Sequence, residues 1–195
     1  MMKWYKSVLW PFCIALSLVA CNSREKEIKS IAELQLRVDS MLSSAEVLTP
    51  EQRSLAKELI DSYFAFADTY PEDTLGAAYL FEAARLNGRL PDFQASIDLF
   101  RRVADNYPQD DLAPKSLLSI AGIYDITMQD FPKAEQVYRE IKEKYPLQSE
   151  QYGIDFVLQT LGKSPEEILM ELQKGKSDTL DIANGVPAPE ETDVN

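Results

Sequence analysis

The sequence has 195 residues, of which 45% are hydrophobic, enough for one domain of ordinary size with its own core but not for two large domains. Its 32 acidic and 20 basic residues give a formal charge of −12, which disfavours nonspecific binding to nucleic acid or to an anionic membrane surface. It has no histidine and two cysteines, which excludes histidine-based triads, a zinc cluster and a disulfide framework.

Residues 1–20 are typical of a secretory signal peptide, because two lysines precede an apolar run that is short for a membrane span. The run ends in Leu18-Val19-Ala20-Cys21, which resembles the lipobox of bacterial lipoproteins. The resemblance implies cleavage between Ala20 and Cys21 and lipidation of the Cys21 thiol, with acyl chains such as palmitate holding the protein on a membrane. The alternatives are an ordinary signal peptide with a chance cysteine, or an uncleaved anchor.

Residues 21–27 are expected to form a short polar, lipidated tether. The cysteine is followed by Asn22, rather than an aspartate, and then by Ser23; by resemblance to enterobacterial sorting rules this favours delivery to the outer membrane. The expected location is therefore the bacterial cell envelope, on the outer membrane and facing the periplasm.

Two helices are predicted next, over residues 28–48 and 50–70. The first has an apolar stripe with alternating spacings of three and four, so it needs a helical partner. Packing on the next helix is favoured over a coiled-coil dimer, since only about three heptads are present. Thr49, Pro50 and Gln52 predict a capping box at the start of the second helix.

Two further hairpins are predicted, over residues 74–87 with 92–107 and 113–127 with 131–145, from turn residues and from prolines that fall in first turns. Helices over 149–161 and 164–172 are expected to cover the end of the array, the second capped by Ser164. The acidic stretch 173–195 has little to bury, so it is predicted to be disordered.

A Tyr-Pro pair recurs at Tyr70, Tyr107 and Tyr145, at intervals of 37 and 38 residues. Self-similarity at such a period indicates stacked helical units. Each proline is expected to end a helix at the preceding tyrosine, whose ring should pack on the next unit. The turn between Tyr124 and Asp130 contains one residue more than the standard repeat, which makes the third block longer.

The third block resembles the tetratricopeptide repeat family at Leu117, Ile120, Ala121, Tyr124, Ala134, Tyr138 and Pro146. The resemblance implies an all-α fold over residues 28–172, a right-handed α-solenoid of antiparallel helix pairs with about three repeats and C-terminal capping helices. In this family the first helices line a concave groove. Transferred to this sequence, that groove is lined by Leu80, Ala84, Asn87, Lys115, Leu118 and Asp125, together with Ala77 and Gly122.

The leading hypothesis is a membrane-anchored adaptor that binds envelope proteins through this groove and has no catalytic residues, cofactor or metal of its own. It resembles short relatives of the BamD (YfiO) lipoproteins, which implies a role in outer-membrane protein assembly, or of the YbgF-type factors linked to envelope division. A ligand-capturing lipoprotein of a transporter is the alternative from another class, and it would need a pocket with convergent polar groups. An envelope hydrolase would have to function without histidine.

Overall fold

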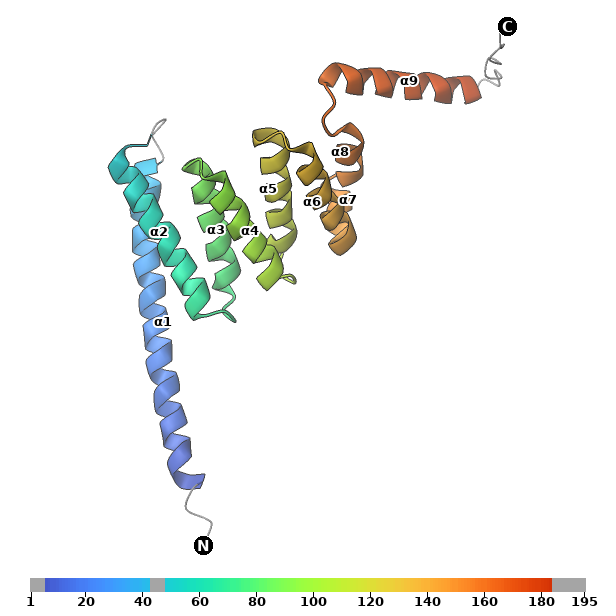
Figure 1. Ribbon diagram of the computed structural model, residues 1–195. Coiled ribbons are helices and arrows are strands. Elements are labelled where there is room, and N and C mark those ends of the chain that lie inside the picture. Colours follow the sequence, from blue (N-terminus) through green and yellow to red (C-terminus); the bar gives the residue numbers. More distant parts are fainter. Residues whose placement is uncertain (1–5, 43–47, 184–195) are drawn as a thin grey trace, which may run out of the picture. The chain divides into compact units, whose positions relative to one another are not determined.

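The computed structural model describes the backbone of residues 6–42 and 48–183 and the side chains of residues 23–42 and 48–174. Every regular element within these ranges is a helix (Figure 1), which confirms the all-α prediction. The chain divides into two compact units, Met1–Ile123 and Tyr124–Asn195. In the described part of the chain, no helix is both long enough and apolar enough to span a bilayer.

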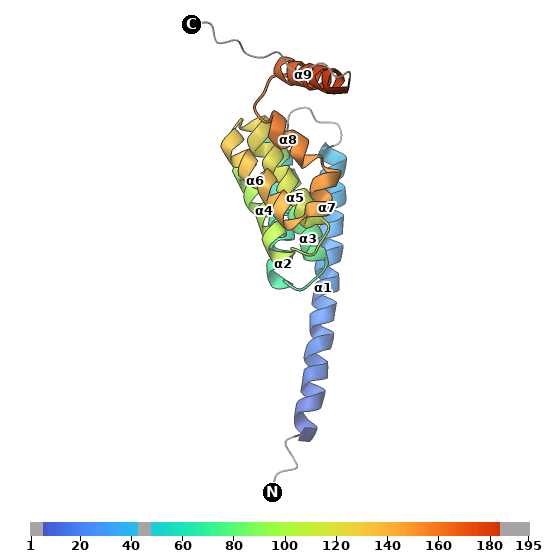
Figure 2. The same ribbon diagram turned by 90° about the vertical axis from the view of Figure 1, so that its right-hand side faces the viewer.

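The first unit contains five helices in its described residues. They are α1 (Lys6–Leu42), α2 (Pro50–Thr69), α3 (Leu75–Arg89), α4 (Phe93–Asn106) and α5 (Leu112–Gly122). Consecutive helices run antiparallel and pack side by side, as Figures 1 and 2 show from two directions, and α3 also contacts α5. Their apolar stripes meet in one core, whose most buried large side chains include Phe66, Leu80, Val103 and Leu117.

The two Tyr-Pro joins of this unit end their helices in the same way. Tyr70 and Tyr107 have φ values of −126° and −127°, and their amides donate to the carbonyls of Phe66 and Val103 at 2.9 and 3.0 Å. Tyr145, in the second unit, ends α6 with φ −133°. The helices therefore end at the tyrosines, as predicted from the proline that follows each of them.

After Tyr70 and Tyr107, an aspartate three residues later bonds to the start of the next helix. The amides of Asp73 and Asp110 donate to the carbonyls of Tyr70 and Tyr107 at 3.0 and 2.9 Å. Their carboxylates accept from the amides two residues later, at 3.0 and 2.8 Å. The repeat in the sequence is thus matched by a repeat of hydrogen bonds. The same two bonds form within residues 70–75 and again within residues 107–112.

Tyr107 packs back on the first turn of α3, in its own hairpin, so the prediction that the ring packs on the next repeat was wrong for this tyrosine. Its phenol lies against Gly76 in the first turn of α3, where a Cβ would be 2.9 Å from the ring atom Cζ and closer still to the hydroxyl oxygen. Glycine is what lets the end of α4 approach the backbone of α3 so closely.

The predicted helix starts are set by local hydrogen bonds. Thr49 and Gln52 form the expected capping box, with reciprocal bonds of 3.2 and 2.8 Å. Asp92 and Asp130 cap α4 and α6 by accepting from the amide three residues later, each at 3.2 Å. These side chains supply partners for amides that an isolated helix leaves unpaired.

The start of α1 differs from the prediction, because the helix begins at Lys6 and includes residues 21–27, where a tether was expected. Glu25 forms an ion pair of 3.2 Å with Lys29, one turn later. Charged residues with long side chains are good helix formers, and such pairs stabilise the helix further. The helix ends at Leu42, and the remainder of the predicted span includes residues 43–47, which lie outside the described residues.

The second unit begins within η1 (Ile123–Thr127), a π-helical turn that follows α5. A π turn holds one more residue than an α turn, so it accommodates the extra residue noted in the third block. The unit boundary here divides the predicted third hairpin, with α5 in the first unit and α6 (Phe131–Lys144) in the second.

The remaining helices of the second unit are α7 (Pro146–Gln151), α8 (Ile154–Thr160) and α9 (Pro165–Ala183). The helix predicted over 149–161 is interrupted at Gly153, which has φ +64°, a conformation that glycine adopts readily. Ser164 and Glu167 form a reciprocal cap, as expected. Helix α9 continues past the predicted end near residue 172, since no Pro or Asn-Gly breaker comes before Asn184; residues 184–195 lie outside the described residues.

Candidate functional site

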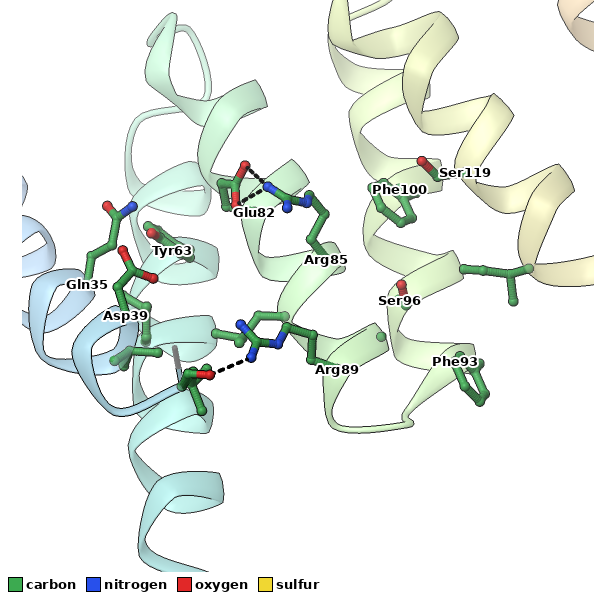
Figure 3. Close-up of a pocket in the computed structure, with 16 residues that line it drawn as sticks. Gln35, Asp39, Tyr63, Glu82, Arg85, Arg89, Phe93, Ser96, Phe100 and Ser119 are labelled. Atoms are coloured by element: carbon green, nitrogen blue, oxygen red, sulfur yellow. Dashed lines mark hydrogen bonds and ion pairs between the residues drawn. The ribbon is translucent and has the colours of Figure 1, made fainter. Parts of the chain in front are cut away.

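An open cavity of about 630 Å³ lies in the first unit (Figure 3). Its walls come from α1 to α5 and the first residue of η1. The lining residues are Gln35, Val38, Asp39, Leu42, Leu59, Tyr63, Glu82, Arg85, Leu86, Gly88, Arg89, Phe93, Ser96, Phe100, Ser119 and Ile123. The volume lies in the range of ligand-binding clefts, about 300–1,000 Å³.

The floor of the cavity is apolar and belongs to the core of the unit. Val38 and Leu42 come from the buried stripe of α1, Leu59 from α2, and Leu86 and Phe100 from α3 and α4, and all five are at most 8% exposed. Phe100 is held in place by an edge-on contact with Phe81, with the ring centroids 5.1 Å apart. The stripes that build the core therefore also form the floor, which gives it a fixed shape.

The rim carries two arginines of α3 that already have partners within the unit. Arg85 Nη1 lies 3.0 Å from both carboxylate oxygens of Glu82, one turn earlier. Arg89 Nη2 donates to the carbonyl of Leu42 at 3.0 Å, where a cation complements the carbonyl end of α1. Figure 3 shows Gln35 and Asp39 on α1 facing this arginine-bearing side of α3. The rim thus has both signs of charge.

A tyrosine hydroxyl lies among these groups. Tyr63 is 2% exposed, and its ring stacks on Tyr79 with centroids 4.9 Å apart. Burial, followed by the negative charges of Glu82 and Asp39, raises the pKa of Tyr63 well above its usual range. The phenol therefore stays protonated at physiological pH and can act as a neutral hydrogen-bond donor or acceptor.

The two serines of the lining donate their hydroxyls to backbone carbonyls. Ser96 Oγ donates to the carbonyl of Ala84 at 2.7 Å, and Ser119 Oγ donates to the carbonyl of Lys115 at 2.9 Å. In the described part of the chain, no cluster of acidic or cysteine side chains is arranged to hold a metal ion. What the cavity offers is an apolar surface, mixed charge and a few hydrogen-bonding groups, which suits binding.

The predicted groove residues of α3 lie on the buried face of the helix. Leu80 and Ala84 have no exposed surface and Asn87 is 8% exposed, so they belong to the core. The cavity is lined instead by Glu82, Arg85, Leu86 and Arg89. At about 100° per residue, this second set is centred roughly half a turn from the first. The face with small and apolar residues is packed against neighbouring helices, and the face with charged residues is open.

The other predicted groove residues also lie outside the lining. Lys115 is exposed and Leu118 half-buried on α5. Asp125 is in the second unit, where it accepts a hydrogen bond of 3.2 Å from the hydroxyl of Tyr138. Burial and this carboxylate raise the pKa of Tyr138 to about 12. Of the additional residues, Ala77 is fully buried, and at Gly122 an added Cβ would meet nothing within 4 Å.

One pattern in the sequence could have indicated the residues of α3 that line the cavity. Glu82, Arg85 and Arg89 follow one another at spacings of three and four, so they form a polar stripe along one face of α3. A polar stripe of this kind normally faces solvent. The sequence alone does not show that α1 lies beside this stripe and forms another side of the cavity. Ala20 and Cys21 lie within α1, and their side chains are outside the described ones.

Comparison with known proteins adds no assignment: no protein family, no curated protein and no solved structure matches this chain.

Proposed function

We propose that this protein is a lipid-anchored, tetratricopeptide-like adaptor that holds protein partners at a membrane of the bacterial cell envelope. The observation that carries the binding part is the cavity in the first unit, which has an apolar floor and a charged rim and is bordered by five successive helices. A helical or extended segment of a partner would lie along this surface and bury apolar side chains on its floor.

The repeat architecture of the proposal rests on the recurring joins. The same hydrogen bonds recur at residues 70–75 and 107–112, and consecutive helices pack as antiparallel neighbours. We propose that they form about three units of a right-handed α-solenoid, with the last helices as its cap. Repetition of this kind is what curves a helical array and creates a concave binding surface.

The partner is proposed to be a protein segment because the rim has few polar groups left to bind a small polar ligand. Both rim arginines are held by groups of the unit itself, Arg85 by Glu82 and Arg89 by the Leu42 carbonyl. Recognition therefore depends mainly on shape and apolar contact, with modest affinity.

The membrane anchor of the proposal rests on the lipobox-like sequence ending at Cys21. Diacylglycerol on this cysteine would hold the protein in the envelope, with outer-membrane protein assembly or coordination of envelope division as the process that the adaptor serves. Each buried methylene of an acyl chain contributes about 0.8 kcal/mol, so the anchor outweighs the repulsion of an acidic protein from a membrane.

A second candidate is a lipoprotein that captures a small ligand for a transporter, and the volume of the cavity favours it. The groups that would orient such a ligand are Gln35, Asp39 and the Tyr63 hydroxyl. Thermal unfolding of the purified protein separates the two candidates. A stabilising metabolite would support ligand capture, whereas stabilisation by amphipathic peptides alone would support the adaptor.

The adaptor is tested by reversing one charge at the rim of the cavity. Arg85→Glu and Lys57→Glu both replace a cation by an anion on an exposed helix face, but only Arg85 borders the cavity. Arg85→Glu places a second, unpaired carboxylate beside Glu82 at the rim, which an apolar partner segment could cover only at a cost. Proteins that copurify with the detergent-extracted protein are therefore expected to be lost in Arg85→Glu and retained in Lys57→Glu. The same proteins copurifying with both variants would show that the cavity does not bind them.

A further inference from the structure

An ion pair within the first unit fixes α1, near Arg24, to the join between α2 and α3. Both Arg24 Nε and Arg24 Nη2 donate to the carboxylate of Asp73, with Nη2 3.1 Å from Oδ1. The Asp73 side chain is only 9% exposed, and it also accepts from the amide of Leu75 at 3.0 Å. The guanidinium holds the pKa of Asp73 below its usual range, so the pair stays charged at neutral pH. A bidentate pair of this kind sets orientation as well as distance.

Beyond Arg24, α1 is packed on the unit along its whole described length. Ile31, Leu34, Val38 and Leu42 are at most 8% exposed. Arg24 follows Cys21 by only three residues, and the helix is continuous between them. No loop therefore separates the proposed lipidation site from the packed helices.

The two Tyr-Pro joins lie at the same end of the unit as Arg24. Figure 1 shows the α2–α3 and α4–α5 joins at the end from which the N-terminal part of α1 projects, and the α3–α4 turn at the other end. The cavity lies toward that other end. Its lining comes from the C-terminal parts of α1 and α3 and from the first half of α4.

We infer that acylated Cys21 seats the first unit directly on the lipid surface, with the Tyr70–Thr74 and Tyr107–Asp111 joins at the headgroups and the cavity held away from the membrane. A helix rises about 1.5 Å per residue, so Gln35 to Leu42 lie roughly 20 to 30 Å beyond Cys21 along α1. A partner segment would thus be bound at a fixed height. This inference rests on the lipid anchor of the proposed function.

The charge of this edge indicates the kind of membrane. Glu72 and Asp111 are exposed and Asp110 is half-buried at the joins, and the cation Arg24 is paired with Asp73. Anionic lipids would repel such an edge over a Debye length. The surface that fits it is therefore a leaflet of zwitterionic headgroups.

The test measures height above the membrane at the two ends of α4. Gln109→Cys lies in the α4–α5 join and Gln94→Cys lies near the start of α4, and both positions are exposed. Each variant is purified from membranes with its native acyl chains, labelled with a fluorescent donor, and reconstituted in phosphatidylcholine vesicles with headgroup-labelled acceptor lipids. We expect strong energy transfer at position 109 and a donor about 20 Å farther from the acceptors at position 94.

Equal transfer at both positions, or stronger transfer at position 94, would overturn the inference and leave the anchor intact. Protein that carries no acyl group and stays in solution would instead overturn the anchor, and the inference with it. A matched variant with a ten-residue Gly-Ser spacer between Ser23 and Arg24 should keep the attachment and the helical content but lose the difference between the two labels.

Discussion

Gly76→Ala tests how closely Tyr107, the tyrosine of the second Tyr-Pro pair, approaches the start of α3. An added Cβ would lie 2.9 Å from Tyr107 Cζ and even closer to the hydroxyl, so the ring has to move. Overpacking of this kind costs about 1–3 kcal/mol, from which the better helix propensity of alanine subtracts up to about 1 kcal/mol. The net loss is expected to be about 1–2 kcal/mol, and the melting temperature followed by far-UV circular dichroism should fall by roughly 2–8 °C.

Gly122→Ala is the matched control, because nothing lies within 4 Å of a Cβ at that helical glycine. It should leave stability unchanged or raise it by up to about 1 kcal/mol. Tyr107→Phe removes the atom nearest to the new methyl group, so it should restore part of the stability lost in Gly76→Ala. If Gly76→Ala is as stable as the parent protein, or if its effect equals that of Gly122→Ala, then Tyr107 does not crowd this position.

Three further predictions concern a cap, a buried phenol and the anchor. Thr49→Ala removes the capping box of α2 and should lower the free energy of unfolding, measured by urea titration, by about 1 kcal/mol. Thr69→Ala, at the other end of α2, should change the free energy of unfolding little. Equal effects of the two substitutions would contradict the cap assignment. The pKa of Tyr138 in the folded protein, about 12, lies above the unfolded value of 10, so its contribution to stability is complete below pH 10 and is lost as the pH rises toward 12. Tyr138→Phe should therefore flatten the fall in stability between pH 10 and 12, and an unchanged slope would show that this phenol is not responsible. Cys21→Ala should release the protein from sedimented membranes while Ser23→Ala stays bound, and continued sedimentation of Cys21→Ala would rule out lipidation as the anchor.

Helix ends were predictable from the sequence where a side chain bonds to the backbone nearby. The Thr49–Gln52 box was predicted in this way, and the ends at the tyrosines were predicted from the proline that follows each of them. The caps at Asp92 and Asp130, which were not predicted, act over the same short range. Short-range chemistry of this kind is visible in one sequence without knowledge of the packing.

Features that depend on packing were predicted less well. The stripe with Leu80 and Ala84 was assigned to the groove by resemblance, but those residues are core, and the cavity uses the opposite face with Arg85. Both faces have helical periodicity, so the pattern shows that α3 has two faces and leaves open which one a neighbouring helix covers. The unit boundary at Ile123 depends in the same way on how the helices pack against one another.

The adaptor account is tested most directly by in-cell photocrosslinking from the cavity. A benzophenone amino acid replaces Arg85 at the rim or Lys57 on the exposed face of α2, in protein that keeps its signal peptide and Cys21. The account predicts that position 85 yields adducts with a defined set of envelope proteins on irradiation and that position 57 does not. Adducts from position 57 with none from position 85 would contradict it, because the cavity would then not be the surface that binds partners.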